Sequence, residues 1–212
     1  MKETVVLLFS GGLDSTYTMY HYLTQTELNV HAHHISLRYA IEPRWEQEDA
    51  ACVSIIEWLR KNVGPVEYST SRFDWFDPLL PRPGWDGDLC SLIGWNVALN
   101  IPGFKYLCLG AIPEDFEFDR TSDRCNEENR HNVWRAMRKG GTQEERDLTH
   151  PDKQFPLVSL NFTKQMIVQM IPRELAKLTW SCRTPNLSHD GKSHCGICKG
   201  CKALKDIGYP NI

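Results

Sequence analysis

The stretch TVVLLFSGGLDS, residues 4–15, decides the fold of this 212-residue chain. Its first half, residues 4–9, is short, rich in β-branched side chains and almost continuously apolar, as expected of a parallel strand that is covered on both faces. A helix over residues 13–23 follows at once, and Asp14 and Ser15 suit its first turn. A strand that passes through a glycine turn into a helix is the usual first unit of an α/β fold.

The rest of the chain alternates in the same way between apolar strand-like runs and helical patterns. The further predicted strands lie over residues 30–35, 106–111 and 155–159. The further predicted helices lie over residues 46–62, 92–99, 127–139 and 163–176. Pro172 should end or kink the last helix. The polar residues 113–156 are predicted to form a segment that is mobile or covers the substrate. Strands separated by helices predict a doubly wound parallel sheet with right-handed crossovers.

The glycine turn itself, SGGLDS at residues 10–15, is the predicted phosphate site. Glycines let the backbone turn tightly and approach a ligand, while amides at the helix N-terminus and the hydroxyls of Ser10 and Ser15 present donors to an anion. The loop has no lysine, so it differs from the Walker-type phosphate loop, which needs Gly-Lys followed by Ser or Thr. A glycine turn before a helix is also a common structural device, and Asp14 could be only a helix cap.

Length and charge limit the classes of function. We expect one domain over residues 1–178 and a small metal-binding segment over residues 179–212. With 24 Lys and Arg against 27 Asp and Glu, the chain has no global basic field, so nucleic acid is an unlikely partner. No apolar run approaches the roughly 20 residues of a membrane span. The N-terminus does not show the basic, apolar and small-residue regions that follow one another in a signal peptide. We therefore expect a cytoplasmic protein.

The second chemical motif is a set of four cysteines, Cys182, Cys195, Cys198 and Cys201. Cysteines three apart can place two sulfurs on one cation, and the earlier thiolate would close a tetrahedral site. Zinc is the predicted metal. An iron–sulfur cluster is the rival, although the ferredoxin run requires a Cys-Pro where this chain has Lys205. A redox-active or sulfur-carrying set of thiols is the third interpretation. Either His189 or His194 could replace one sulfur, but solvated loop histidines are the favoured interpretation.

Three further histidines lie on the predicted strand over residues 30–35. Because side chains alternate along a strand, His31 and His33 should share one face and His34 should point to the other. We predict that they are residues of the sheet and not a metal site.

The loop SGGxDS resembles the pyrophosphate loop of the PP-loop ATP pyrophosphatases. This resemblance implies cleavage of ATP between the α and β phosphates, adenylation of a substrate oxygen and release of pyrophosphate. Magnesium and the loop amides would meet the charge of the leaving group.

The loop and the C-terminal motif together resemble the 7-cyano-7-deazaguanine synthases, which share TWSC at residues 179–182 and the three later cysteines. FPL at residues 155–157 followed by Lys164, and Gly110 through Glu114-Asp115, match further parts of the family pattern. The resemblance implies a doubly wound fold of the adenine-nucleotide α-hydrolase type. It also implies ATP-dependent conversion of 7-carboxy-7-deazaguanine and ammonia to the nitrile, through an adenylated acid and an adenylated amide.

The same resemblance implies roles for individual residues. The implied catalytic residues are Ser10, Asp14, Ser15 and Lys164. The implied ATP-binding residues are Ser10, Gly11, Gly12, Leu13, Asp14 and Ser15. The implied zinc ligands are Cys182, Cys195, Cys198 and Cys201. The cofactors would be ATP, Mg²⁺ and Zn²⁺, and the partners would be a small 7-deazapurine and ammonia, with a homodimer left open. Lys164 could instead be a solvated helix lysine.

One departure from the family concerns the substrate pocket. The family carries a Gly-Arg-Asn turn where this chain reads WDGD at residues 85–88. The candidate substrate-binding residues are Trp85, Trp95, Asp115 and Phe116, the aromatic ones as stacking partners for the base. The arginines that could replace the missing cation are Arg38, Arg44, Arg120 and Arg124.

Three alternatives remain open for the function. A non-catalytic zinc-ribbon interaction protein would leave the phosphate loop unexplained. A related adenylating ligase would stop at the amide or act on another carboxylate. A PP-loop tRNA-modifying enzyme would use catalytic cysteines and normally adds a basic RNA-binding domain, for which this chain has neither spare length nor positive balance.

Overall fold

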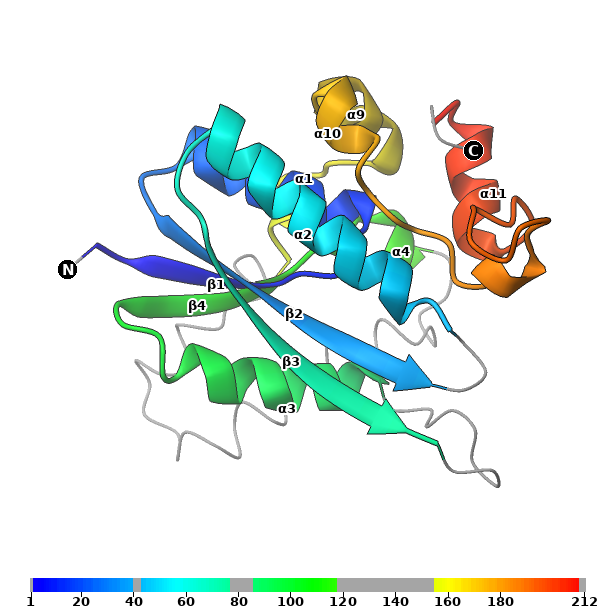
Figure 1. Cartoon of the computed structure of the whole chain (residues 1–212). Helices are drawn as coiled ribbons and strands as arrows, with labels where there is room; N and C mark the ends of the chain where they lie inside the picture. Colours follow the sequence, from blue (N-terminus) through cyan, green and yellow to red (C-terminus); the bar gives the residue numbers. More distant parts are fainter. Residues whose placement is uncertain (1, 40–42, 77–85, 118–154, 210–212) are drawn as a thin grey trace.

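The fold is a parallel four-stranded sheet in the order β3-β2-β1-β4 (Figure 1). The computed structural model describes residues 2–39, 43–76, 86–117 and 155–209, and only the backbone of residues 86–88 and 116–117. The strands are β1 (Thr4–Leu8), β2 (Asn29–Tyr39), β3 (Glu67–Trp75) and β4 (Phe104–Leu109). Strand β1, called the central strand below, lies between β2 and β4. Its Val5 lies opposite Val30 of β2 and Tyr106 of β4.

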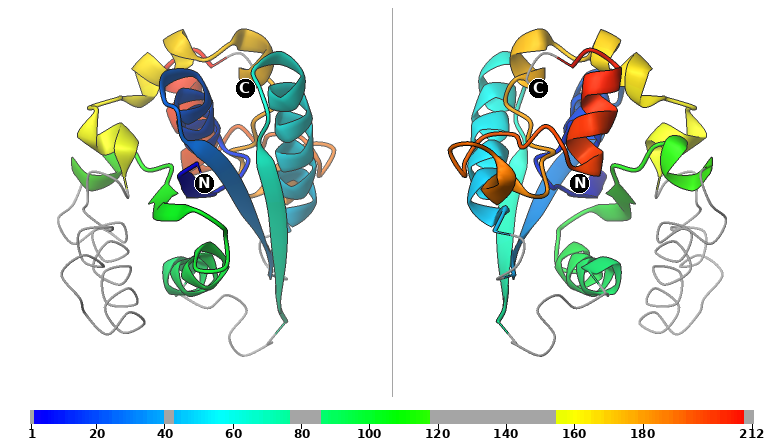
Figure 2. Two further views of the ribbon diagram at one scale, coloured as in Figure 1. Left: turned by 90° about the vertical axis from the view of Figure 1, so that its left-hand side faces the viewer. Right: turned by 90° about the vertical axis from the view of Figure 1, so that its right-hand side faces the viewer.

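Helices cover both faces of this sheet, which confirms the predicted doubly wound α/β fold. Helices α1 (Leu13–Gln25) and α2 (Trp45–Asn62) lie on one face, and α3 (Asp86–Ala98) lies on the other (Figures 1 and 2). The shorter elements are α4 (Glu114–Glu117), α8 (Pro156–Ser159), α9 (Lys164–Met170), α10 (Arg173–Ala176), η1 (Pro185–Leu187) and α11 (Lys199–Asp206). None of the helices in the described part of the chain is long and apolar enough to cross a membrane.

The central strand divides its side chains between two apolar cores. Val5 and Leu7 point into the larger core, which they share with α1 and α2. Val6 points the other way and packs with Trp95 of α3 and with Leu107. Because successive side chains of a strand point to opposite faces, a strand buried on both faces must be mainly apolar, as residues 5–8 are.

The histidines of β2 are held within the sheet as predicted. His31 and His33 both contact the Ser69 hydroxyl of β3, with nitrogen–oxygen distances of 2.7 and 2.8 Å. His34 faces α2, where its Nε2 lies 2.8 Å from an oxygen of Asp49. Burial, with a smaller effect of the neighbouring histidines, lowers the pKa of His33 to about 4, so His33 is neutral at physiological pH.

Two sequence predictions about the strands were wrong. Residues 155–159 form the helical turn α8 and not a strand, because Pro156 stands in the first turn, where its fixed φ favours a helix. The edge strand β3 was missed, since its side chains are at most half-buried and carry no continuous apolar run.

The predicted helices are confirmed where the structure describes them. Helix α3 begins earlier than expected, at Asp86. Pro172 separates α9 from α10 and so breaks the predicted helix over residues 163–176. The predicted helix over residues 127–139, and most of the polar segment 113–156, lie outside the described residues.

The C-terminal segment packs onto the main core. Leu204 of α11 and Tyr209 belong to the same cluster of buried side chains as α1 and α2. Thr179 hydrogen-bonds the carbonyl of Ala176 and the Tyr209 hydroxyl. The boundary between residues 178 and 179 therefore separates two segments that share apolar contacts, and their division into domains stays a prediction.

Gly110, directly after β4, lies against the start of α1. A Cβ at this position would come within 2.8 Å of Ser15 Cβ and closer still to the Ser15 backbone. No side chain fits there unless α1 moves, so Gly110 fixes how closely β4 can approach the glycine turn.

We predict that Gly110→Ala lowers the free energy of unfolding by about 1–3 kcal/mol, because overpacking forces the backbone to shift. Gly64→Ala is the matched control, since a Cβ there meets nothing within 4 Å. The control should change stability by less than about 0.5 kcal/mol. Urea unfolding of both variants measures the difference, and equal midpoints would show that the contact at Gly110 is unimportant.

Candidate functional site

The glycine turn stands at the carboxyl end of the central strand, where open α/β sheets bind their ligands. Gly11 has a φ of +71°, in the left-handed region, and a Cβ on it would lie 3.0 Å from Cys52 Sγ. Gly12 is the N-cap of α1 and offers no side-chain cap. The hydroxyls of Ser10 and Ser15 lie 3.0 Å apart. Backbone and hydroxyl donors therefore converge on the start of a 13-residue helix, whose dipole favours an anion.

Asp14 and Lys164, far apart in sequence, meet beside this turn. Lys164 opens α9, whose N-cap Thr163 accepts a hydrogen bond from the Met166 amide. Its Nζ lies 3.2 Å from Asp14 Oδ2, and both side chains are about one-fifth to one-quarter exposed. The Lys164 amide donates to Glu114 Oε1 at 2.8 Å. Two of the residues predicted to act on phosphate are thus brought together.

The predicted substrate-binding residues are not gathered into one pocket by the described side chains. Trp95 is 1% exposed and packs against Val6 and Leu107, with its ring edge-on to Phe104. It is a core residue in this structure and presents no face on which a base could stack. Asp115 accepts a hydrogen bond from the Ile112 amide, within its own turn. Trp85 and the side chain of Phe116 lie outside the described residues.

The four C-terminal cysteines form a compact group, as their spacing predicted. Their sulfurs all lie within 4.8 Å of one another, and Cys182 and Cys201 are buried. Amides of the chain donate to three of the sulfurs: Cys195 to Cys182, Cys198 to Cys195 and Cys201 to Cys198, at 3.3–3.4 Å. Such a group can hold a metal ion, since metals bind thiolates and backbone donors stabilise thiolate charge.

The surroundings of Cys195 favour its ionised thiolate, the form that binds a metal. Partial burial acts to raise its pKa, but hydrogen bonds from the Thr184 hydroxyl and from the amides of Ile197 and Cys198 lower the pKa to about 6. A thiol with this pKa is mostly ionised at neutral pH, which reduces the proton competition that a metal must overcome.

The histidines near the cysteines are placed outside the sulfur group. The His194 ring lies tilted against the Trp180 ring, at 36° and with ring centroids 4.3 Å apart, and its Nδ1 lies 3.9 Å from Cys201 Sγ. His189 is exposed. The group of possible metal ligands found in the described part of the chain consists of sulfur atoms alone.

The cysteine segment is joined directly to the glycine turn. The Trp180 amide donates to the Gly11 carbonyl at 2.8 Å, and the Trp180 indole donates to the Cys182 carbonyl at 2.9 Å. The sequence did not predict this contact, because hydrogen bonds between backbones distant in sequence leave no pattern of residue types. The two motifs therefore form one continuous site.

A charged cluster at the start of α2 borders the turn and was only partly foreseen. Arg44 pairs with Glu48 at 3.4 Å, and both side chains are largely buried. Burial raises the pKa of Glu48, against the opposing effects of Arg44, His34 and Arg183. The nearby Glu46, in the first turn of the same helix, is exposed. The spacing of four residues between Arg44 and Glu48 was the available signal for the pair.

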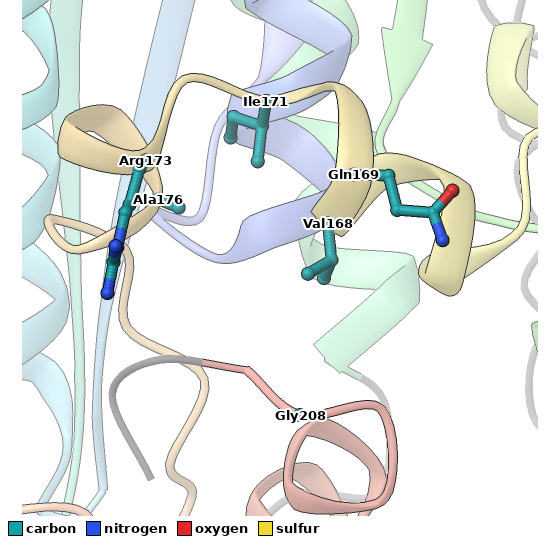
Figure 3. Close-up of a pocket in the computed structure, with 6 residues that line it drawn as sticks. All are labelled: Val168, Gln169, Ile171, Arg173, Ala176 and Gly208. Atoms are coloured by element: carbon teal, nitrogen blue, oxygen red, sulfur yellow. The ribbon is translucent and has the colours of Figure 1, made fainter.

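A cavity of about 340 Å³ lies elsewhere, between α9, α10 and the end of α11 (Figure 3). It is lined by Val168, Gln169, Ile171, Arg173, Ala176 and Gly208. None of these residues was predicted to belong to the site. A largely apolar lining with one amide and one guanidinium offers no nucleophile or acid–base pair.

Comparison with known proteins gives a fold likeness only. No family model matches the chain, and no curated protein is significantly similar to it. A solved structure that matches is the U34-tRNA thiolase NcsA from Methanococcus maripaludis with its [4Fe-4S] cluster, at 17% identity and a TM-score of 0.46. The match covers 97% of this chain and 65% of that one, so this chain spans less than two-thirds of that structure. Function must be argued from this chain's own residues.

We predict that Cys198→Ser removes most of the bound metal and lowers stability by at least about 3 kcal/mol, or roughly 6–12 °C in melting temperature. The physical reason is that the C-terminal segment has little apolar surface of its own, so we expect its folding to depend on the metal. Cys90→Ser, in α3, is the control and should keep both metal content and melting temperature. Elemental analysis with thermal unfolding measures the effect, and an unchanged metal content in Cys198→Ser would refute the assignment.

Proposed function

We propose that the protein is an enzyme of the ATP pyrophosphatase type, which transfers the AMP part of ATP to a substrate oxygen and releases pyrophosphate. The observation that carries this proposal is the SGGLDS turn between the central strand and α1, with converging hydroxyls and no lysine in the loop. Without the Walker lysine, the loop is suited to hold pyrophosphate as a leaving group through backbone donors.

Different residues around the turn would bind the phosphate oxygens and the magnesium ion of the triphosphate. Ser10, Ser15 and the loop amides would hold phosphate oxygens, and Asp14 would hold Mg²⁺, which neutralises charge on the leaving pyrophosphate. Lys164, at the start of α9, would supply a positive charge close to Asp14. Its ion pair with Asp14 supports this placement, because it shows that the ammonium group reaches the first turn of α1.

The substrate that we propose is 7-carboxy-7-deazaguanine with ammonia, on the resemblance of both motifs to the 7-cyano-7-deazaguanine synthases. A carboxylate oxygen bonds to the α-phosphorus of ATP as the bond to pyrophosphate breaks. Ammonia then adds to the acyl carbon, and AMP leaves with loss of a proton to give the amide. The amide oxygen then bonds to the α-phosphorus of a second ATP as pyrophosphate and one N–H proton leave, and loss of AMP with the remaining N–H proton gives the nitrile.

We propose zinc for the cysteine group on the separation of its sulfurs. Four sulfurs bound to one ion at about 2.3 Å lie about 3.8 Å apart in a tetrahedron. Each thiolate of a four-iron cluster binds a different iron, so the thiolates around a cluster stand farther apart. The Cys195 and Cys201 sulfurs are 3.9 Å apart. This distance fits a single ion, whose role would be to fix the segment beside the glycine turn.

The alternative is a tRNA-modifying enzyme, the activity named for the structural neighbour. It shares the adenylation step, and the cysteine group beside the nucleotide turn suits sulfur chemistry as well. The two proposals differ in the adenylated atom, a carboxylate oxygen or a base oxygen of tRNA. The near-neutral charge of this chain favours the small substrate.

We expect AMP and pyrophosphate as the stoichiometric products of turnover, because the loop is built to release pyrophosphate. Lys164→Met should lower kcat about a hundredfold through loss of charge stabilisation. Lys61→Met, at the far end of α2, should have no effect. Phosphorus NMR of the reaction mixture distinguishes the products, and formation of ADP and orthophosphate would contradict the proposal.

The end product is tested by supplying the synthetic amide of 7-carboxy-7-deazaguanine with ATP. We expect nitrile and AMP, although this step is the more demanding one, since an amide oxygen is a weaker nucleophile and needs closer positioning. Mass spectrometry detects the products. Turnover of the acid without any turnover of the amide would show a ligase that stops halfway, whereas AMP formation that depends on tRNA would favour the alternative.

A further inference from the structure

The backbone of residues 180–182 crosses directly over the start of α1. A Cβ built on Gly12 would lie 3.5 Å from the Trp180 carbonyl oxygen and 3.8 Å from Ser181 Oγ. It would lie 3.3 Å from Ser10 Oγ. Two hydroxyls from segments far apart in sequence thus flank the N-cap residue of the same helix.

The Ser181 hydroxyl is available for a ligand. The residue is partly exposed, and within the described part of the chain its side chain makes no hydrogen bond to a protein atom. The hydroxyls of Ser10 and Ser15, by contrast, contact each other. Among the hydroxyls of Ser10, Ser15 and Ser181, only that of Ser181 donates no hydrogen bond to a protein group in the described part of the chain.

The position of Ser181 is fixed from both sides. The preceding residue, Trp180, is hydrogen-bonded to Gly11, and the following residue, Cys182, belongs to the cysteine group. A Cβ on Gly200, within the cysteine motif, would overlap the Ser181 carbonyl oxygen, so the two segments are in close contact. A hydroxyl held in this way loses little conformational freedom when it binds a ligand.

We propose that Ser181 is a ligand of the nucleotide phosphates. Its Oγ–H donates to a phosphate oxygen that is bound at the start of α1, and the metal bound by Cys182 and its neighbours keeps the hydroxyl in place. This inference rests on the proposed function and adds a residue to the site that the SGGLDS motif does not contain. It also gives the metal a role at the nucleotide site that goes beyond stability of the tail.

The test is to measure binding of α,β-methylene-ATP with Mg²⁺ to the metal-loaded protein by calorimetry. This analogue cannot be cleaved at the α–β bond. Ser181→Ala should weaken its binding about tenfold, as expected for one lost hydrogen bond to a charged group. Adenosine, which has no phosphate, should bind both proteins equally in a competition assay. Ser54→Ala, which removes a hydroxyl bonded within α2, is the matched control and should bind the analogue as the unmodified protein does.

The outcomes separate this inference from the proposed function. If the unmodified protein binds the analogue and Ser181→Ala binds it equally well, Ser181 is not a phosphate ligand, and the proposed function stands. Equal losses for the analogue and adenosine would mean that the substitution disturbs the whole site, which also overturns the inference. If the unmodified protein binds no analogue, the proposed function itself fails, and the inference fails with it.

Discussion

The start of α1 is the constraint on which the rest of the site depends. A helix N-terminus carries amides with no partner inside the helix, and here the N-cap is Gly12, which has no side chain to satisfy them. The surrounding structure brings polar groups to this point from three directions: the serines of the turn, Lys164 from α9 and Ser181 from the C-terminal segment. An anion at this position would meet hydrogen-bond donors and a positive charge from all three directions.

Close contact between backbones makes this convergence possible. Gly110 lets the end of β4 touch the first turn of α1, and Gly200 lets the cysteine motif touch Ser181. The C-terminal segment contributes few apolar side chains, but Leu204 and Tyr209 anchor it in the main core. Metal binding by the four sulfurs, as proposed, would act on the same short segment as this apolar packing, and both would hold it against the glycine turn.

The parts predicted from sequence are those that local patterns encode. The first strand, the turn and α1 follow from periodicity and two glycines, and the sulfur group follows from the spacing of its cysteines. The edge strand β3 was missed because half-exposed side chains lack an apolar pattern. Trp95 was expected to stack on a base because sequence shows that a residue is aromatic but not that it is buried. Contacts such as Trp180 with Gly11 depend on tertiary packing, which no local pattern records.

The ion pair between Asp14 and Lys164 suits the proposed function, in which a highly charged ligand would bind to a nearly neutral protein. Both side chains keep about one-fifth to one-quarter of their surface exposed, so solvent screens the pair and weakens its contribution to stability. Separating the two groups is therefore inexpensive in free energy. If Mg²⁺ and a triphosphate bind as proposed, Asp14 would exchange the ammonium group for the metal ion, and Lys164 would exchange the carboxylate for a phosphate. Each charge keeps a partner of opposite sign throughout, which is why a weak pair serves here better than a strong one.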